Sequence, residues 1–353
     1  AEVNYVIGQA YAIRAYSYFM LAQSFARTYK GHESEPCCPI YTEPTVAGTE
    51  GKPRSTVQEV YDLIVGDINK AVELLNGTTR KHISHIDYCV ALGFQARIAQ
   101  VMEDWNTAKK ASEEAIATSK CTIAKVSDFK GVNSTSAPNV MWGAEILSDQ
   151  SGMYAGFFTH MDADADKYGA KARKQISKEL YEKMGTTDDR LIWWNPEDAN
   201  NKAGGYQQEK FKFSEIQTWM GDYIWMRIEE MYLIKAEGQA MSGNVAGAKT
   251  TLESFIQEYR DPEFTCKATS PQDMQEEIYH QRRIELWGEG MSWFDIMRLN
   301  KGVDRRGAGY PNASSIFNIQ PGDPILLWRL PEKEIQANKA LSNNDNNKAT
   351  PIP

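Results

Sequence analysis

Two carboxylates in the segment RRIELWGEGMSWFDIMRLNKG, residues 282–302, have the residue type and spacing of a general acid and a general base. Glu285 and Glu289 are four residues apart, so on a helix they would lie on the same face. Arg282 and Arg283 flank them, and a nearby guanidinium lowers the pKa of a carboxyl group and keeps it ionised. Because acid–base catalysis needs one protonated partner, this pattern favours ion pairing over catalysis.

Adjacent carboxylates occur at Asp188-Asp189 and at Glu229-Glu230. A glycoside hydrolase needs two carboxyl groups about 5 to 9.5 Å apart across one cleft. Neighbouring side chains point apart on a strand or a helix, so both pairs are poor candidates. The sequence also contains no G-x-S-x-G, HExxH or P-loop motif. It therefore predicts a protein that is not an enzyme and needs no cofactor.

A possible calcium ligand set is the D-x-D-x-D pattern of Asp162, Asp164 and Asp166, which is how an EF-hand loop begins. Lys167 stands where that loop needs its turn glycine, and Arg173 stands where it needs its bidentate glutamate. The sequence therefore favours a solvated acidic loop over a calcium site, and it predicts no other metal site.

Aromatic residues interleaved with planar polar groups suit sugar binding, because sugar C–H faces stack on rings while the hydroxyls take hydrogen bonds. Residues 121–222 have this texture, and the WWNP stretch at 193–196 reads as a loop edge. The alternative for each single aromatic residue is packing of this region onto the helices. We expect the ligand contacts to be Trp193, Trp194, Asn195, Tyr154, Tyr168, Arg190 and Trp219.

Helical periodicity defines the elements that must position these residues. Residues 6–29 and 55–77 each read as an amphipathic helix. Two later segments, starting at Tyr88 and Ile228, share a spacing of small residues across a short turn. The matched positions are Ala96 with Ala236, Ala108 with Ala248, and Ala115 with Phe255. This spacing is typical of tetratricopeptide (TPR) helical hairpins, although two unrelated hairpins would also explain it.

Residues 278–299 are expected to form one further helix, which is apolar around most of its circumference and therefore buried. Gly288 and Gly290 would then allow a neighbouring helix to approach closely. We expect Arg282 to pair with Glu285, and Asp295 with Arg298, each three residues along. Glu289 and Arg283 would need partners on other elements, because an unpaired buried charge is costly. A buried Trp293 would make truncation at that position strongly destabilising.

The overall prediction is an all-α chain with a TPR-like scaffold, read as a single domain over residues 1–353. Its parts are TPR-like helices at 1–120, an insertion at 121–222, further helices at 223–302 and a loop-rich tail at 303–353. A net charge of −8 without a basic run argues against nucleic-acid binding. No window of about 18 apolar residues is present.

Five stretches resemble the SusD/RagB family. The segment QRRIELWGEGMSWFDIMR is similar to the signature helix of that family, with Ser292 where the family often has Arg or His. AIRAYSYFMLAQSFARTYKG, YIWMRIEEMYLIKAEGQAMSGN and LPEKEIQANKALSNN are similar to three further family elements, and DDRLIWW is similar to a D-x-R element in the insertion.

This resemblance implies a cell-surface lipoprotein of the Bacteroidetes outer membrane, held by an N-terminal lipid anchor that this chain lacks. Such proteins bind a glycan or a related nutrient and cover a SusC-like TonB-dependent transporter. Their ligand residues vary too much to be transferred by position. The alternative from the residues alone is a TPR-type protein-interaction scaffold without its own small-ligand site.

Overall fold

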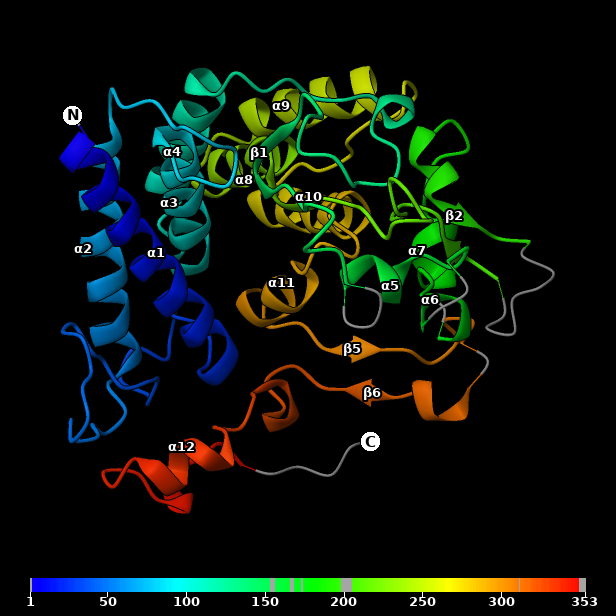
Figure 1. Cartoon of the computed structure of the whole chain (residues 1–353). Coiled ribbons are helices and arrows are strands. Elements are labelled where there is room, and N and C mark those ends of the chain that lie inside the picture. Colours follow the sequence, from blue (N-terminus) through cyan, green and yellow to red (C-terminus); the bar gives the residue numbers. More distant parts are fainter. Residues whose placement is uncertain are drawn as a thin grey trace.

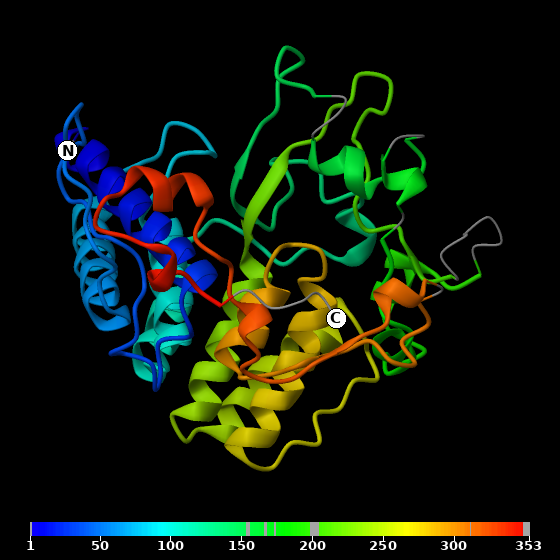
Figure 2. The ribbon, with the colours of Figure 1, turned by 90° about the horizontal axis from the view of Figure 1, so that it is seen from below.

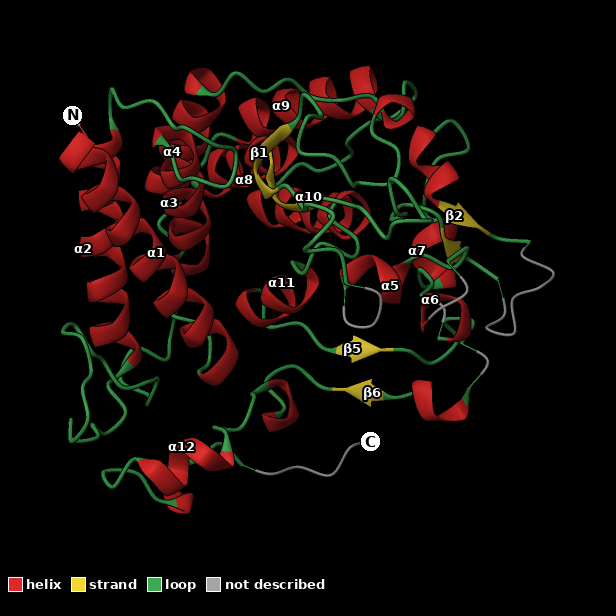
Figure 3. Ribbon diagram, in the orientation of Figure 1, coloured by secondary structure: helices red, strands yellow, loops and turns green. Residues whose placement is uncertain are grey.

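The computed structural model describes residues 2–152, 156–165, 168–172, 174–197, 205–310 and 312–348. The chain is mainly helical, with a few short strands (Figures 1 and 3). The long helices are α1 (Glu2–Phe25), α2 (Val57–Leu75), α3 (Tyr88–Met102), α4 (Trp105–Thr118), α8 (Ile228–Met241), α9 (Val245–Tyr259) and α10 (Pro271–Glu285). The predicted all-α scaffold is therefore confirmed.

Local sequence sets the ends of these helices. Thr56 and Glu59 form a capping box at the start of α2, in which each side chain accepts a hydrogen bond from the backbone of the other. Asp87 caps α3 by accepting a hydrogen bond from the amide of Val90. Glu103 ends α3 in the left-handed conformation. The short turn that follows leads directly into α4, so α3 and α4 form one hairpin.

The two predicted hairpins, α3–α4 and α8–α9, lie side by side although about 110 residues separate them in the chain (Figure 1). Helices α4 and α8 form the shared interface. A Cβ added to Gly238 on α8 would lie 2.9 Å from the backbone nitrogen of Lys109 on α4, so the two backbones are in close contact. The matched positions Ala96, Ala108, Ala236 and Ala248 are fully buried. These small residues allow the helices to pack as the spacing predicted.

The described elements between the hairpins are all short, and they extend from the centre to the right of Figure 1. They are η1 (Val126–Asp128), β1 (Val140–Ala144), α5 (Phe157–Met161), α6 (Tyr168–Lys171), α7 (Lys178–Glu182), η2 (Asp189–Trp193), β2 (Trp194–Asn195), β3 (Gln207–Gln208) and β4 (Tyr223–Arg227). Strand β1 pairs antiparallel with β4. That pairing joins the start and the end of the region, so the loops between them project from one short ribbon.

The segment expected to be one helix at 278–299 is broken. Helix α10 ends at Glu285, and α11 (Ser292–Arg298) begins after a turn. Gly288 and Gly290 have φ of +77° and +84°, which an α-helix excludes. Trp293 is half-buried, so this residue is less enclosed than the largely buried helix that the sequence predicted. The glycines serve a turn, and the periodic apolar pattern continues across it into a second helix.

The carboxyl-terminal segment crosses back to the first helix, as Figure 2 shows by the red tail beside the blue α1. It holds β5 (Val303–Asp304), η3 (Ala313–Ser315), β6 (Asn318–Ile319), η4 (Pro324–Leu326), α12 (Glu332–Ala337) and η5 (Asn343–Asp345). The amide of Trp328 donates to the carbonyl of Ser24 at 3.1 Å. Arg54 donates to the carbonyls of Phe25 and Asp345 at 2.9 and 2.8 Å. These contacts tie the tail to the end of α1.

Candidate ligand-binding site

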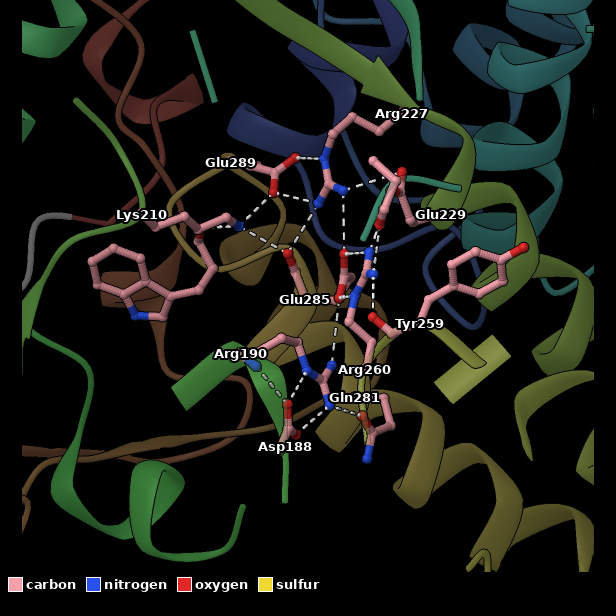
Figure 4. Close-up of polar contacts among 12 residues, drawn as sticks. Asp188, Arg190, Lys210, Arg227, Glu229, Tyr259, Arg260, Gln281, Glu285 and Glu289 are labelled. Carbon is pink, nitrogen blue, oxygen red and sulfur yellow. Dashed lines mark hydrogen bonds and ion pairs between the residues drawn. The ribbon is translucent and has the colours of Figure 1, made fainter. Parts of the chain in front are cut away.

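A buried ionic network forms where the insertion meets α10 (Figure 4). Glu285 at its centre is fully buried and receives hydrogen bonds or ion pairs from three arginines. Arg260 donates to both its oxygens at 2.8 and 2.9 Å, Arg227 lies 3.2 Å away and Arg190 3.4 Å away. Burial alone would raise the pKa of Glu285, but the three guanidinium groups outweigh it and hold the pKa well below its ordinary value. Glu285 is therefore ionised at neutral pH.

Arg190, predicted as a ligand contact, belongs to this network instead. Its side chain is fully buried and donates to both oxygens of Asp188 at 3.0 and 2.8 Å and to Gln281 at 2.8 Å. That prediction is wrong for a physical reason: the D-x-R spacing lets one carboxylate hold the arginine inward, where α10 completes its hydrogen bonds. Arg190 thus fixes η2 to α10 and does not face a ligand.

Glu289 extends the network towards the surface. Arg227 donates to its two oxygens at 2.9 and 2.7 Å, and the Lys210 ammonium donates to it at 2.6 Å. Burial lowers the pKa of Lys210 to about 8. Arg227 lies on β4 and Lys210 lies in the insertion. Glu289 therefore has partners on other elements, as the sequence predicted. The expected Asp295–Arg298 pair is present at 2.8 Å.

The expected pair of Arg282 with Glu285 is wrong, because Arg282 instead donates to Asp295 across the turn at 2.8 Å. Arg283 is half-buried and lies over the Tyr279 ring of its own helix, 5.7 Å from the ring centroid. This cation–π contact joins Arg283 to α10 itself. Lys183, and with it Arg283, lowers the pKa of Glu179 on α7, so Arg283 also has an oppositely charged neighbour on a separate element, as the sequence suggested.

The expected surface platform at Trp193 and Trp194 is also wrong. The two side chains are only 4% and 3% exposed and pack with Ile176, Leu180 and Ile284. The two indole rings pack between η2 and α10 and form part of the core of the insertion. Asn195 is exposed, and its side chain accepts a hydrogen bond from the amide of Glu197 at 3.0 Å.

Two of the remaining predicted contacts, Tyr168 and Trp219, pack against other aromatic rings. Tyr168 is 46% exposed and stacks on His160, with ring centroids 5.0 Å apart. Trp219 is half-buried and packs edge-on against Phe213 at 5.4 Å. Tyr154 lies outside the described residues. Tyr168 and Trp219 remain proposals as ligand contacts.

In the acidic loop that begins at Asp162, the described carboxylates have partners within the protein. Asp162 is buried and accepts hydrogen bonds from the amides of Asp164 and Phe213 at 2.9 Å each. Asp164 pairs with Lys212 at 2.9 Å, and Asp166 lies outside the described residues. Across the part of the chain that is described, no cluster of three or more His, Cys, Asp or Glu side chains could hold a metal ion.

A cavity of about 380 Å³, which we call the aromatic cavity, opens beside the network. It is lined by Val132, Phe157, Phe158, Phe211, Asp222, Tyr223, Ile224, Trp225, Gly288, Glu289 and Gly290. Phe157 and Trp225 are the most exposed of its rings, at 37% and 40%. Exposed rings beside carboxylates and backbone amides are the groups that sugar recognition needs.

Trp225 is held firmly although it is exposed. Its ring lies against buried Trp142, with centroids 4.5 Å apart, and the Trp142 indole N–H donates to the carbonyl of Ser84 at 2.9 Å. The carbonyl of Trp225 accepts a hydrogen bond from Arg97 at 2.9 Å. The sequence did not predict Trp225 as a contact because residues 223–227 resemble part of a helical motif. The alternation of Tyr223, Trp225 and Arg227 was the strand signal that could have revealed it.

Stacked helical hairpins with an irregular insertion define a protein built on a TPR-like scaffold, with an aromatic cavity beside the insertion. Residues 159–347 match the family model described as the SusD family, and the chain belongs to that family. Residues 1–99 match a second model, described as "Starch-binding associating with outer membrane". The chain is 24% identical to the SusD-like protein P38 of Formosa agariphila over 85% of this chain and 67% of that protein.

Solved structures have the same fold. A SusD-like carbohydrate binding protein from Bacteroides vulgatus superposes with a TM-score of 0.84 at 27% identity, over 98% of this chain and 78% of that one. A SusD superfamily protein from Bacteroides thetaiotaomicron gives 0.82 at 20% identity, over 99% and 79%. No helix in the described ranges is long and apolar enough to cross a membrane.

Proposed function

We propose that this protein binds an oligosaccharide in the aromatic cavity at the outer face of the outer membrane and delivers it to a SusC-like TonB-dependent transporter. The observation that carries the proposal is Trp225, an exposed ring on a rigid support beside a cavity of about 380 Å³. Family membership and the carbohydrate-binding relative from Bacteroides vulgatus support it. The description of the second family model supports the outer-membrane location.

Three of the four carboxylates in the adjacent pairs that could have served hydrolysis are paired with arginines. Asp188 pairs with Arg190, Glu229 with Arg227 and Arg260, and Glu230 with Arg97. Each of these carboxylates is committed to an arginine inside the protein, which leaves it poorly placed to exchange a proton with a bound sugar. We therefore propose binding without cleavage.

The test is a glycan array followed by titration of the hits with wild type, Trp225→Ala and Trp328→Ala. Trp328 is 59% exposed but does not line the aromatic cavity, so its truncation controls for loss of any surface indole. We expect Trp225→Ala to weaken binding more than tenfold and Trp328→Ala to leave it unchanged. Equal binding by both variants would refute the site. Release of shortened products would refute the absence of catalysis.

The alternative, a TPR-type interaction scaffold, has one observation in its favour. A groove of about 390 Å³ runs between α2, α3 and α4, lined by residues such as Val65, Leu92 and Met102. Binding of a protein partner that Lys110→Glu weakens, with no glycan bound at any concentration tested, would favour this alternative. The transporter partner is tested separately, by co-purification of a TonB-dependent transporter with the tagged protein from detergent-solubilised outer membranes.

A further inference from the structure

A second cavity adjoins the aromatic cavity on the other side of Trp225. Its volume is about 150 Å³, and we call it the ionic cavity. Ile224, Trp225, Glu289 and Gly290 line both cavities. Trp225 therefore stands between two compartments, and a chain molecule that stacks on it can enter both.

The ionic cavity combines apolar walls with buried charges. Its lining from the first helix is Tyr16, Phe19, Met20 and Gln23. The charged residues in its lining are Arg97, Glu230, Arg282, Glu289, Asp295 and Arg298. Such a lining offers a face for C–H groups and polar atoms for hydroxyls.

Every cation of this lining is committed to a carboxylate. Arg97 donates to both oxygens of Glu230 at 2.9 and 2.6 Å. Arg298 donates to both oxygens of Glu237 at 2.6 and 3.0 Å. These arginines are 6% and 8% exposed, so their charges are already neutralised inside the protein.

Arg282 offers a ligand one unpaired hydrogen-bond donor, although its positive charge is already paired with Asp295. It is 3% exposed and its Nε donates to Asp295 at 2.8 Å, while its Nη1 is buried and has no partner. An unpaired buried donor is costly, and a hydroxyl oxygen of a bound molecule would satisfy it.

The two cavities together offer an anionic ligand no free positive charge. Their linings hold four carboxylates, Asp222, Glu230, Glu289 and Asp295, against three arginines. A ligand carboxylate or sulfate would lose its water and find no uncommitted cation, which penalises anionic sugars.

We propose that the ionic cavity is a second subsite for an uncharged sugar unit of the same chain that stacks on Trp225, and that the site selects neutral over anionic oligosaccharides. This inference rests on the proposed function. It adds a substrate class: neutral glycans long enough to occupy both compartments.

The experiment measures the Kd of malto-, cello-, xylo- and manno-oligosaccharides of two and six units, with oligogalacturonide and alginate hexamers as acidic probes. Met20→Trp fills the ionic cavity from α1, and Leu21→Trp adds the same ring at an exposed neighbouring position that lines neither cavity. We expect Met20→Trp to weaken binding of the neutral hexamer about tenfold and to spare the dimer. Leu21→Trp should change neither, and acidic hexamers should bind wild type at least tenfold more weakly than the neutral one.

The outcomes separate the two proposals. If Trp225→Ala abolishes hexamer binding but Met20→Trp does not weaken it, the second subsite is refuted and the proposed function stands. Acidic hexamers that bind as tightly as neutral ones would refute the selectivity. If no hexamer of either class binds, both the inference and the proposed function fail. Should Met20→Trp not fold, Met20→Arg tests the same point, because an added cation should tighten binding of the acidic hexamers.

Discussion

Arg227 and Glu289 form a two-point ion pair, with Nε of the arginine 2.9 Å from one carboxylate oxygen and Nη2 2.7 Å from the other. Arg227 ends β4, the strand that carries Trp225, and Glu289 lies in the turn between α10 and α11. Glu289 also lines both cavities. The pair therefore joins the buried network to the proposed ligand site. The segment that resembles the family's signature helix thus supports that site.

Glu285→Gln should strongly destabilise the fold. The substitution removes the charge on which Arg190, Arg227 and Arg260 converge and leaves buried cations uncompensated. Removal of one partner from a buried pair costs about 3–5 kcal/mol, so we expect a loss of that size in the free energy of unfolding. Urea denaturation measures it.

The matched control is Asp304→Asn, which breaks the exposed pair with Arg306. Exposed ion pairs contribute little to stability because water and salt screen them, so this variant should unfold almost as wild type does. Equal stability losses in Glu285→Gln and Asp304→Asn would mean that the network does not hold the insertion in place.

Trp193→Ala and Trp225→Ala should have opposite effects. Trp193 is 4% exposed, and truncation of a buried aromatic ring costs about 3–5 kcal/mol, so its variant should unfold at a lower temperature. Trp225 is 40% exposed, so its variant should lose glycan affinity with little change in melting temperature. Thermal melts beside glycan titrations check both. A normal melt for Trp193→Ala would restore the surface platform expected from the sequence.

The scaffold was predictable because helix periodicity and small-residue spacing are local signals. Ala96 and Ala236 sit at the positions where their hairpins pack, and the Thr56 capping box starts α2 where it was expected. The break after Glu285 was missed because the apolar period continues through it. The positive φ of Gly288 and of Gly290 marks the turn, and neither can be read from the apolar period.

The site was less predictable because burial of a polar or aromatic residue depends on partners distant in the chain. Asp188 holds Arg190 from two residues away, but the hydrogen bonds of Arg190 are completed inside the protein by Gln281, 91 residues away. Trp193 is covered partly by Ile284 on α10. Trp225, in contrast, is exposed because β1 supports it from one side only. Composition identified a region rich in suitable residues but could not show which of them face a ligand.

Stability should fall between pH 6.5 and pH 4 in a way that depends on His280. Burial, with repulsion from Arg283 and Arg190, lowers the pKa of His280 from 6.5 to about 4. In this window the unfolded chain binds a proton that the folded chain excludes, so stability is lost as the pH falls. The shift corresponds to about 2 kcal/mol after allowance for partial exposure.

The measurement is the free energy of unfolding in urea at pH 7 and at pH 4.5 for wild type and His280→Gln. Protonation of the network carboxylates also lowers the free energy of unfolding in acid. This contribution is the same in both proteins, so it cancels in the difference between them. We expect the variant to lose about 2 kcal/mol less than wild type. His82→Gln, at a side chain 46% exposed, should behave as wild type. An identical pH dependence in all three proteins would show that His280 accepts its proton freely in the folded state.

Gly288→Ala and Gly290→Ala test whether the turn after α10 packs closely against the wall of the aromatic cavity. Both glycines have positive φ, so each alanine carries a conformational cost of about 1–2 kcal/mol. Only at Gly288 would the new Cβ also meet a neighbour, since it would lie 2.5 Å from the Phe211 ring, whereas nothing lies within 4 Å at Gly290. Phe211 lines the aromatic cavity, so its displacement changes the cavity wall. Gly290 itself lines both cavities, so the two variants are compared by stability and not by affinity. We expect Gly288→Ala to lose more stability than Gly290→Ala in urea denaturation. Equal losses would mean that Gly288 is not closely packed against Phe211.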